Sequence, residues 1–88
     1  MRYTVHIDRK AAKEMQALDK TTVKRLRERI HELADNPFDL RISGPIKMGT
    51  GERKSRVGDW RLIFEVDETT KTIFILAVKP RRKAYPKQ

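Results

Sequence analysis

The Gly58-Asp59 dipeptide constrains the fold of this chain more than any other feature. It separates "ERKSRV" from "WRLIFEV", and the two runs are typical of antiparallel strands joined by a two-residue turn. A glycine in the first turn position favours a type II′ turn, which needs a positive φ there. Such a turn fixes the register, and the expected cross-strand pairs are Val57 with Trp60, Arg56 with Arg61, Lys54 with Ile63 and Glu52 with Glu65.

One face of the predicted hairpin is cationic. Side chains alternate along a strand. In the second strand of the hairpin Trp60, Leu62, Phe64 and Val66 therefore face the core, while Lys54, Arg56 and Arg61 share the open face. An arginine directly opposite another costs roughly 0.2 to 1 kcal/mol, so stability does not explain this arrangement. Glu52 and Glu65 lie on the same face and could neutralise part of the charge, which is the purely structural interpretation. A bound polyanion explains the cations better.

The overall charge favours the same kind of partner. Lys and Arg number 21 against 12 acidic residues, and the net charge of +9 favours nucleic acid or an acidic protein. The C-terminal stretch "KPRRKAYPKQ" concentrates basic residues and has no acid. Without cysteine there is no disulfide or thiolate metal site, and no apolar stretch suggests a signal or membrane segment. We expect a cytoplasmic protein without a membrane partner.

The segments before the hairpin predict one strand and two helices. "RYTVHI" alternates apolar and polar residues, as a half-buried strand does. Asp8 can cap a first helix, and Thr21 or Thr22 can cap a second that ends at "DNP". The apolar stripes are Ala11, Met15 and Leu18 in the first helix and Val23, Leu26, Ile30 and Leu33 in the second. The short link predicts an antiparallel helical hairpin, with the Lys and Arg of the second helix facing water.

The remaining segments complete the predicted fold. Residues 37–51 form a loop with at most a short strand, and "TIFILAVK" is apolar enough to predict a central strand covered on both faces. The fold class is α+β in the order β-α-α-β-β-β. A helical hairpin packs on one face of a small, mostly antiparallel sheet, and residues 1–88 form a single domain.

Two motifs resemble a known family. "RKSRVGDWRLIFEV", followed by "KPRRKAYPK", is similar to the RelE branch of the RelE/ParE toxin superfamily, over nearly the whole chain. The resemblance implies a microbial ribonuclease-like fold. It also implies a ribosome-dependent endoribonuclease that cuts mRNA in the A site and is neutralised by an acidic, RelB-like antitoxin.

The resemblance also implies a site. On the matching positions, the catalytic group consists of Lys54, Arg56, Arg61, Arg81 and Tyr85. Further RNA contacts are expected from Arg53, Lys79, Arg82 and Lys83, and Arg82 or Lys79 could replace Arg81 if the alignment shifts. Some members have a lysine where this chain has Glu52, which either pairs with Lys54 or accepts a proton.

These residue types suit attack by a ribose 2′-hydroxyl on the neighbouring phosphate. Arg61 and Arg81 would hold the developing negative charge, and Lys54 would handle protons because arginine is too basic to accept one. Tyr85 would stack on a base or donate to the leaving oxygen. His6 and His31 are expected away from the site, and we expect neither a metal nor another cofactor.

Two other classes of function fit the same scaffold. A ParE-like protein would inhibit DNA gyrase by binding alone, and it would not need this basic and aromatic set. A basic RNA- or ribosome-binding module would use the cations only to neutralise phosphates.

Overall fold

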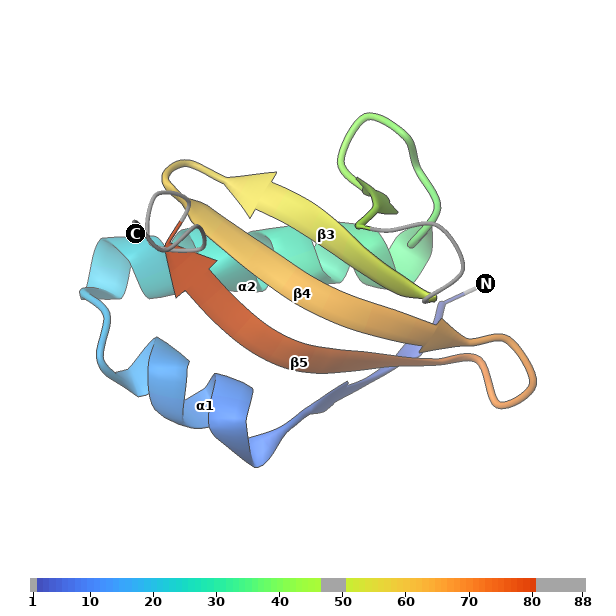
Figure 1. Ribbon diagram of the computed structural model, residues 1–88, viewed down its shortest axis with the longest axis horizontal. Helices are drawn as coiled ribbons and strands as arrows, with labels where there is room; N and C mark the ends of the chain where they lie inside the picture. The colour runs from blue at the N-terminus through green and yellow to red at the C-terminus, as the bar shows by residue number, and fades with distance from the viewer. Residues whose placement is uncertain (1, 47–50, 81–88) are drawn as a thin grey trace, which may run out of the picture.

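Two helices lie on one face of a five-stranded sheet (Figure 1). The structure is a computed structural model that describes residues 2–46 and 51–80. The elements are β1 (Thr4–Ile7), α1 (Arg9–Gln16), α2 (Lys20–Asp35), β2 (Gly44–Pro45), β3 (Glu52–Val57), β4 (Trp60–Asp67) and β5 (Thr72–Pro80). The strand order is β1-β5-β4-β3-β2, with β1 and β5 parallel and the other pairs antiparallel. The predicted α+β class and element order are confirmed, and β2 is the short strand inside the long loop.

The β3–β4 hairpin has the predicted register. All four expected pairs are present, from Val57 with Trp60 at the turn to Glu52 with Glu65 at the far end. Gly58 has a φ of 61°, as the turn requires. A Cβ atom at this position would lie 3.3 Å from the Arg25 guanidinium of α2, so the turn is also close to that helix.

The capping residue of α2 differs from the prediction. Asp19, rather than Thr21 or Thr22, is the N-cap: its carboxylate accepts the Thr22 amide at 3.3 Å and the Thr22 hydroxyl at 2.6 Å. An aspartate can accept both bonds at once, and they lower its pKa below the usual value. Asp8 precedes α1 as predicted, but its side chain makes no capping hydrogen bond. The end of α2 at Asp35 is confirmed.

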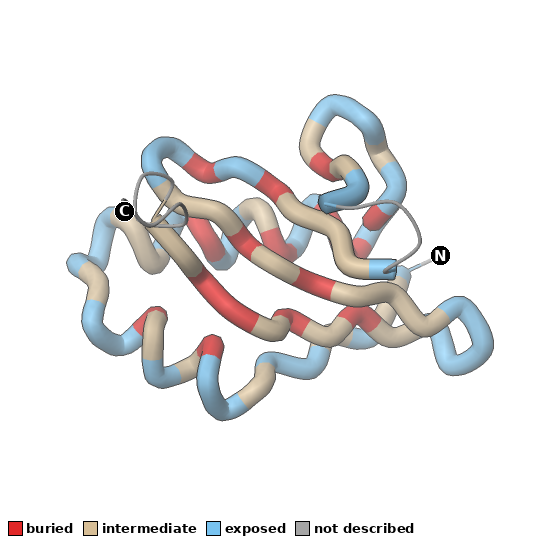
Figure 2. Tube along the Cα trace, viewed as in Figure 1, coloured by how far each residue is buried: buried red, intermediate tan, exposed pale blue. Residues whose placement is uncertain are grey.

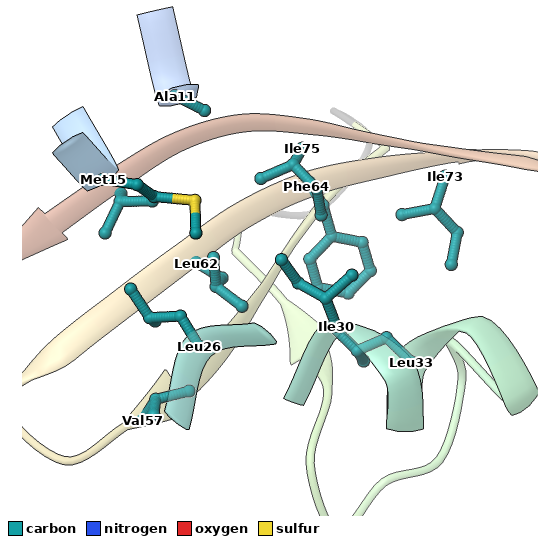
Figure 3. Close-up of a cluster of buried hydrophobic side chains, with 11 residues drawn as sticks. Ala11, Met15, Leu26, Ile30, Leu33, Val57, Leu62, Phe64, Ile73 and Ile75 are labelled. Carbon is teal, nitrogen blue, oxygen red and sulfur yellow. The ribbon is translucent and has the colours of Figure 1, made fainter. Parts of the chain in front are cut away.

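Both helical stripes pack against the inner face of the sheet. Figure 3 shows Met15 of α1 and Leu26, Ile30 and Leu33 of α2 gathered over β4 and β5. Along the strands buried residues alternate with more exposed ones, as the red segments in Figure 2 indicate. The sheet contributes Val57, Leu62, Phe64, Ile73, Ile75 and Val78 to this core.

β5 is a central strand, but in the described structure its second face is not covered by another element. Phe74 and Leu76 on that face are half-buried. The pairing with β4 shifts between Ile63 and Phe64, and Leu76 is left without a counterpart as a β-bulge. The bulge changes the phase, so Ile75 and Val78 both reach the core. This change of phase explains why the "TIFILAVK" segment of β5 is apolar at nearly every position, which simple alternation would not give.

Within residues 2–46 and 51–80, no helix is long and apolar enough to cross a membrane.

Candidate functional site

Three cationic residues form a row across the open face. Arg56 of β3 is directly opposite Arg61 of β4, which is directly opposite Lys79 of β5. Lys54 lies two residues before Arg56 and therefore on the same face, next to Ile63. Neighbouring strands are about 4.8 Å apart, so these side chains can act on one anion. The structure thus brings together the three catalytic candidates that it describes.

Arg61 is more buried than Arg56. It is half-buried in β4, and its Nε atom is fully buried, whereas Arg56 is exposed at the outer side of β3. Lys54 is half-buried and has Gly44 of β2 as its other cross-strand neighbour. The sheet therefore encloses the base of the Arg61 guanidinium, whereas the Arg56 side chain is open to solvent.

Lys79 is drawn away from the row by an acid on α1. Its ammonium donates to Glu14 Oε2 at 2.9 Å, while Glu14 Oε1 accepts the Val78 amide at 2.7 Å. Burial by itself would raise the pKa of Glu14, but these two hydrogen bonds outweigh it and hold the pKa below the usual value. The same contact raises the pKa of Lys79. The charge of Lys79 is thus partly neutralised by Glu14.

Arg53 lies on the opposite side of β3 from Lys54. Its guanidinium carbon is 5.0 Å from the centre of the Phe38 ring, and its Nε donates to the Ser43 hydroxyl at 2.8 Å. Arg53 has the same parity as buried Ser55 and Val57. These contacts attach the loop after α2 to β3, so the structure does not bring Arg53 into the cationic row.

Four predicted site residues lie outside the described residues: Arg81, Tyr85, Arg82 and Lys83. Their roles stay predictions.

Arg29 of α2 was missed by the sequence analysis, which assigned the cations of this helix to water. Its Nη1 donates to the Ser55 hydroxyl at 2.8 Å and to the Arg56 carbonyl at 2.6 Å, and its side chain is only 23% exposed. Arg29 follows Leu26 by three residues and precedes Leu33 by four, so its place beside the apolar stripe could have been recognised. It fixes the backbone that carries Arg56.

The opposite end of the open face has a different character. Here a second set of cross-strand neighbours runs over four strands: His6 of β1 is opposite Phe74 of β5, which is opposite Glu65 of β4, which is opposite Glu52 of β3. This row is four residues from Arg61 along β4, about 13 Å at the usual rise per residue, so His6 lies away from the cations. In the part of the chain that the structure describes, no group of three or more His, Asp or Glu residues could hold a metal ion.

A groove of about 900 Å³ lies between α1 and α2. Its apolar lining includes Met15, Leu18, Val23 and Ile30. Three cations, Lys20, Lys24 and Arg27, and one acid, Glu28, give the lining an excess of positive charge. An apolar floor with basic side chains fits an amphipathic, acidic helix.

Comparison with known proteins decides the family. The family model described as "ParE toxin of type II toxin-antitoxin system, parDE" matches residues 5–85. The chain belongs to the RelE/ParE toxin superfamily. It is a toxin of a type II toxin–antitoxin system.

Similar solved structures support the RelE branch of this superfamily. The archaeal RelE–RelB complex of Pyrococcus horikoshii contains a chain that is 32% identical, with a TM-score of 0.82; the match covers 94% of this chain and 99% of that one. The RelBE2 complex of Mycobacterium tuberculosis gives 25% identity and a TM-score of 0.81, with 92% and 100% covered. A YoeB/ParE toxin from Agrobacterium tumefaciens, at 14% identity and a TM-score of 0.75 over 88% and 96%, shares the fold. No curated protein sequence matches the chain.

Proposed function

We propose that this toxin is a ribosome-dependent endoribonuclease that cuts mRNA in the A site and thereby stops translation. The observation that supports this most strongly is the set of Lys54, Arg56 and Arg61 on the open face. Like charges so close together are unfavourable in the free protein and become favourable when a phosphate lies between them.

The reaction needs no group beyond the RNA and these side chains. The 2′-oxygen of a ribose attacks the adjacent phosphorus and its proton passes to Lys54. The bond to the 5′-oxygen of the next nucleotide breaks, and that oxygen takes up a proton from water. The products are a 2′,3′-cyclic phosphate and a 5′-hydroxyl. Lys54 assists the proton transfer, Arg61 and Arg81 hold the developing charge, and Tyr85 stacks on a base. The decoding centre aligns the mRNA, since orientation alone is worth several kcal/mol.

A modified mRNA tests this mechanism. A single 2′-deoxy sugar at the mapped cut removes the nucleophile, so cleavage on programmed ribosomes should stop there. The unmodified mRNA is the control, and free RNA without ribosomes should be cut poorly. Cleavage of the deoxy mRNA at the same place and rate would rule the mechanism out.

We also propose that an acidic, RelB-like antitoxin binds in the groove between α1 and α2. The structurally similar toxins of Pyrococcus and Mycobacterium are found in complexes with RelB-type antitoxins, and the basic, apolar groove fits an acidic amphipathic helix. Lys24→Glu, on the groove, should weaken binding of the protein encoded by the neighbouring gene. Lys13→Glu, exposed on α1 and outside the groove lining, is the matched control. Equal effects would place the antitoxin elsewhere.

Gyrase inhibition is the second candidate, because the matching family model is that of ParE. A supercoiling assay with purified toxin and DNA gyrase separates the two. Inhibition of gyrase, together with intact mRNA on ribosomes, would favour the ParE-like function.

A further inference from the structure

A pocket of about 240 Å³ lies beside β3, where its pairing with β2 stops. β2 pairs Gly44 with Lys54 and Pro45 with Arg53, so the ladder ends before Arg56. Four cationic side chains line the pocket: Arg29 from α2, Arg41 from the loop after α2, and Lys54 and Arg56 from β3. The pocket therefore collects positive charge from three parts of the fold that are distant in sequence.

Arg29 is fixed at this pocket by contacts within the protein. Its Nη1 makes the two hydrogen bonds to Ser55 and to the Arg56 carbonyl, and its Nε donates to Glu32 at 2.8 Å. Ser55 is only 1% exposed, so the contact is anchored in the interior. A side chain that is already ordered loses little entropy when an anion binds.

Arg41 is held by a neighbouring aspartate. Its Nε and Nη2 donate to the two carboxylate oxygens of Asp39 at 3.1 and 2.8 Å, and these bonds lower the pKa of Asp39 to about 2. Nη1 takes no part in this pair, and guanidinium has further donors there. With Glu32 on Arg29 and Asp39 on Arg41, two carboxylates face four cations, and the pocket keeps an excess of positive charge.

The pocket is continuous with the cationic row. Arg56 belongs to both, and Lys54 lines the pocket on the same face of β3. Arg56 is one strand, or about 4.8 Å, from Arg61. We propose that this pocket binds a second phosphate of the RNA strand, next to the phosphate held at Arg61. This inference rests on the proposed function, since it assumes that RNA lies on the open face. A carboxylate of an acidic protein is the competing occupant, and the binding test compares the two.

The test uses a short RNA that cannot be cut. A tetranucleotide with 2′-O-methyl sugars is prepared with each phosphate in turn replaced by an uncharged methylphosphonate. Binding to the full chain is measured at low salt by NMR, following the Gly44 amide, which lines the pocket. Replacing one particular phosphate should abolish the change in the Gly44 signal. Replacing a different phosphate should weaken binding to the wild type but should have no further effect on binding to Arg61→Ala.

Two charge variants with opposite expected effects distinguish binding from a structural role. Arg41→Gln should weaken binding several-fold and abolish the effect of the pocket phosphate. It should also reduce the slope of log affinity against log salt by about 0.7, the value for one single-strand phosphate contact. Asp39→Asn keeps an oxygen for the Arg41 amide but releases its guanidinium, so binding should become stronger. A structural role would make both variants weaker.

The matched controls are Lys71→Gln and Glu68→Gln, which alter another exposed ion pair, of 2.9 Å, in the β4–β5 turn. Neither should change the response to any single methylphosphonate. The proposal fails if no phosphate affects Gly44, if Arg41→Gln leaves the pattern unchanged, or if that variant weakens antitoxin binding more than RNA binding. Because no cleavage is measured, a toxin that proves not to cut mRNA could still show the second pocket.

Discussion

At the scale of single residues, Arg61 is the described side chain on which the proposed catalysis depends most. We expect Arg61→Ala to lower the single-turnover cleavage rate on ribosomes on the order of a hundredfold to a thousandfold. Ribosome binding should change much less, because the arginine acts mainly on the charge that develops in the transition state. The measurement compares the two quantities, with Lys71→Ala as an exposed control. Equal losses in rate and binding would favour an RNA-binding module.

Glu14 gives the protein an acid-sensitive contact. The folded state lowers its pKa from 4.5, so its stabilising effect is fully present above pH 4.5 and is lost as the pH falls through the lowered value. Glu14→Gln removes the charge but not the shape. We expect the difference in unfolding free energy between wild type and variant to be largest near pH 6 and to shrink towards pH 3. Denaturant titrations at several pH values measure it; a constant difference would contradict this role.

At the scale of elements, the β3–β4 turn depends on glycine. Gly58→Ala should lower the unfolding free energy by about 1 to 2 kcal/mol, because an L-residue is strained at positive φ. Crowding against Arg25 adds to this cost. Gly44→Ala is the matched control, since nothing lies within 4 Å of the added Cβ atom. Chemical denaturation of both variants gives the comparison, and similar losses would mean that the turn is not strained.

The start of α2 depends on Asp19. We expect Asp19→Ala to lower the stability of the protein, because the Thr22 amide and hydroxyl lose their acceptor. Asp8→Ala, at the start of α1, should cost less, since that side chain makes no capping bond. Thermal unfolding of the two variants measures both losses of stability. A larger loss in Asp8→Ala than in Asp19→Ala would mean that the Asp19 contact is absent in solution.

Local rules predicted the elements, but contacts between elements were not readable from the sequence. The register of the hairpin followed from Gly58 because two residues decide the turn geometry. The partners of Arg29 and Glu14 depend on how the helices approach the strands, which no local pattern specifies. Arg53 is a different case: strand alternation already placed it with Ser55, away from Lys54, and the expectation of RNA binding overlooked this.

At the scale of the whole molecule, the two proposed partners use surfaces of different chemistry. The open face offers mainly cations, whereas the groove between α1 and α2 combines cations with an apolar lining. Added salt should therefore weaken RNA binding steeply and antitoxin binding much less, because apolar burial is not screened. Affinities of both partners over a range of salt concentrations test this. Equal slopes would mean that the antitoxin also binds mainly through charge.

The contacts of Glu14 and Arg29 also bear on self-association. Each lies where a flanking strand has stopped, and each occupies a backbone group that a strand from another copy would need: the Val78 amide on one side of the sheet, the Arg56 carbonyl on the other. The Glu14 carboxylate of α1 accepts from the Val78 amide, and the Arg29 guanidinium of α2 donates to the Arg56 carbonyl. Each helix thus covers one border of the sheet with a side chain that satisfies the backbone group there. Each contact therefore opposes the addition of a strand from another copy at that border of the sheet.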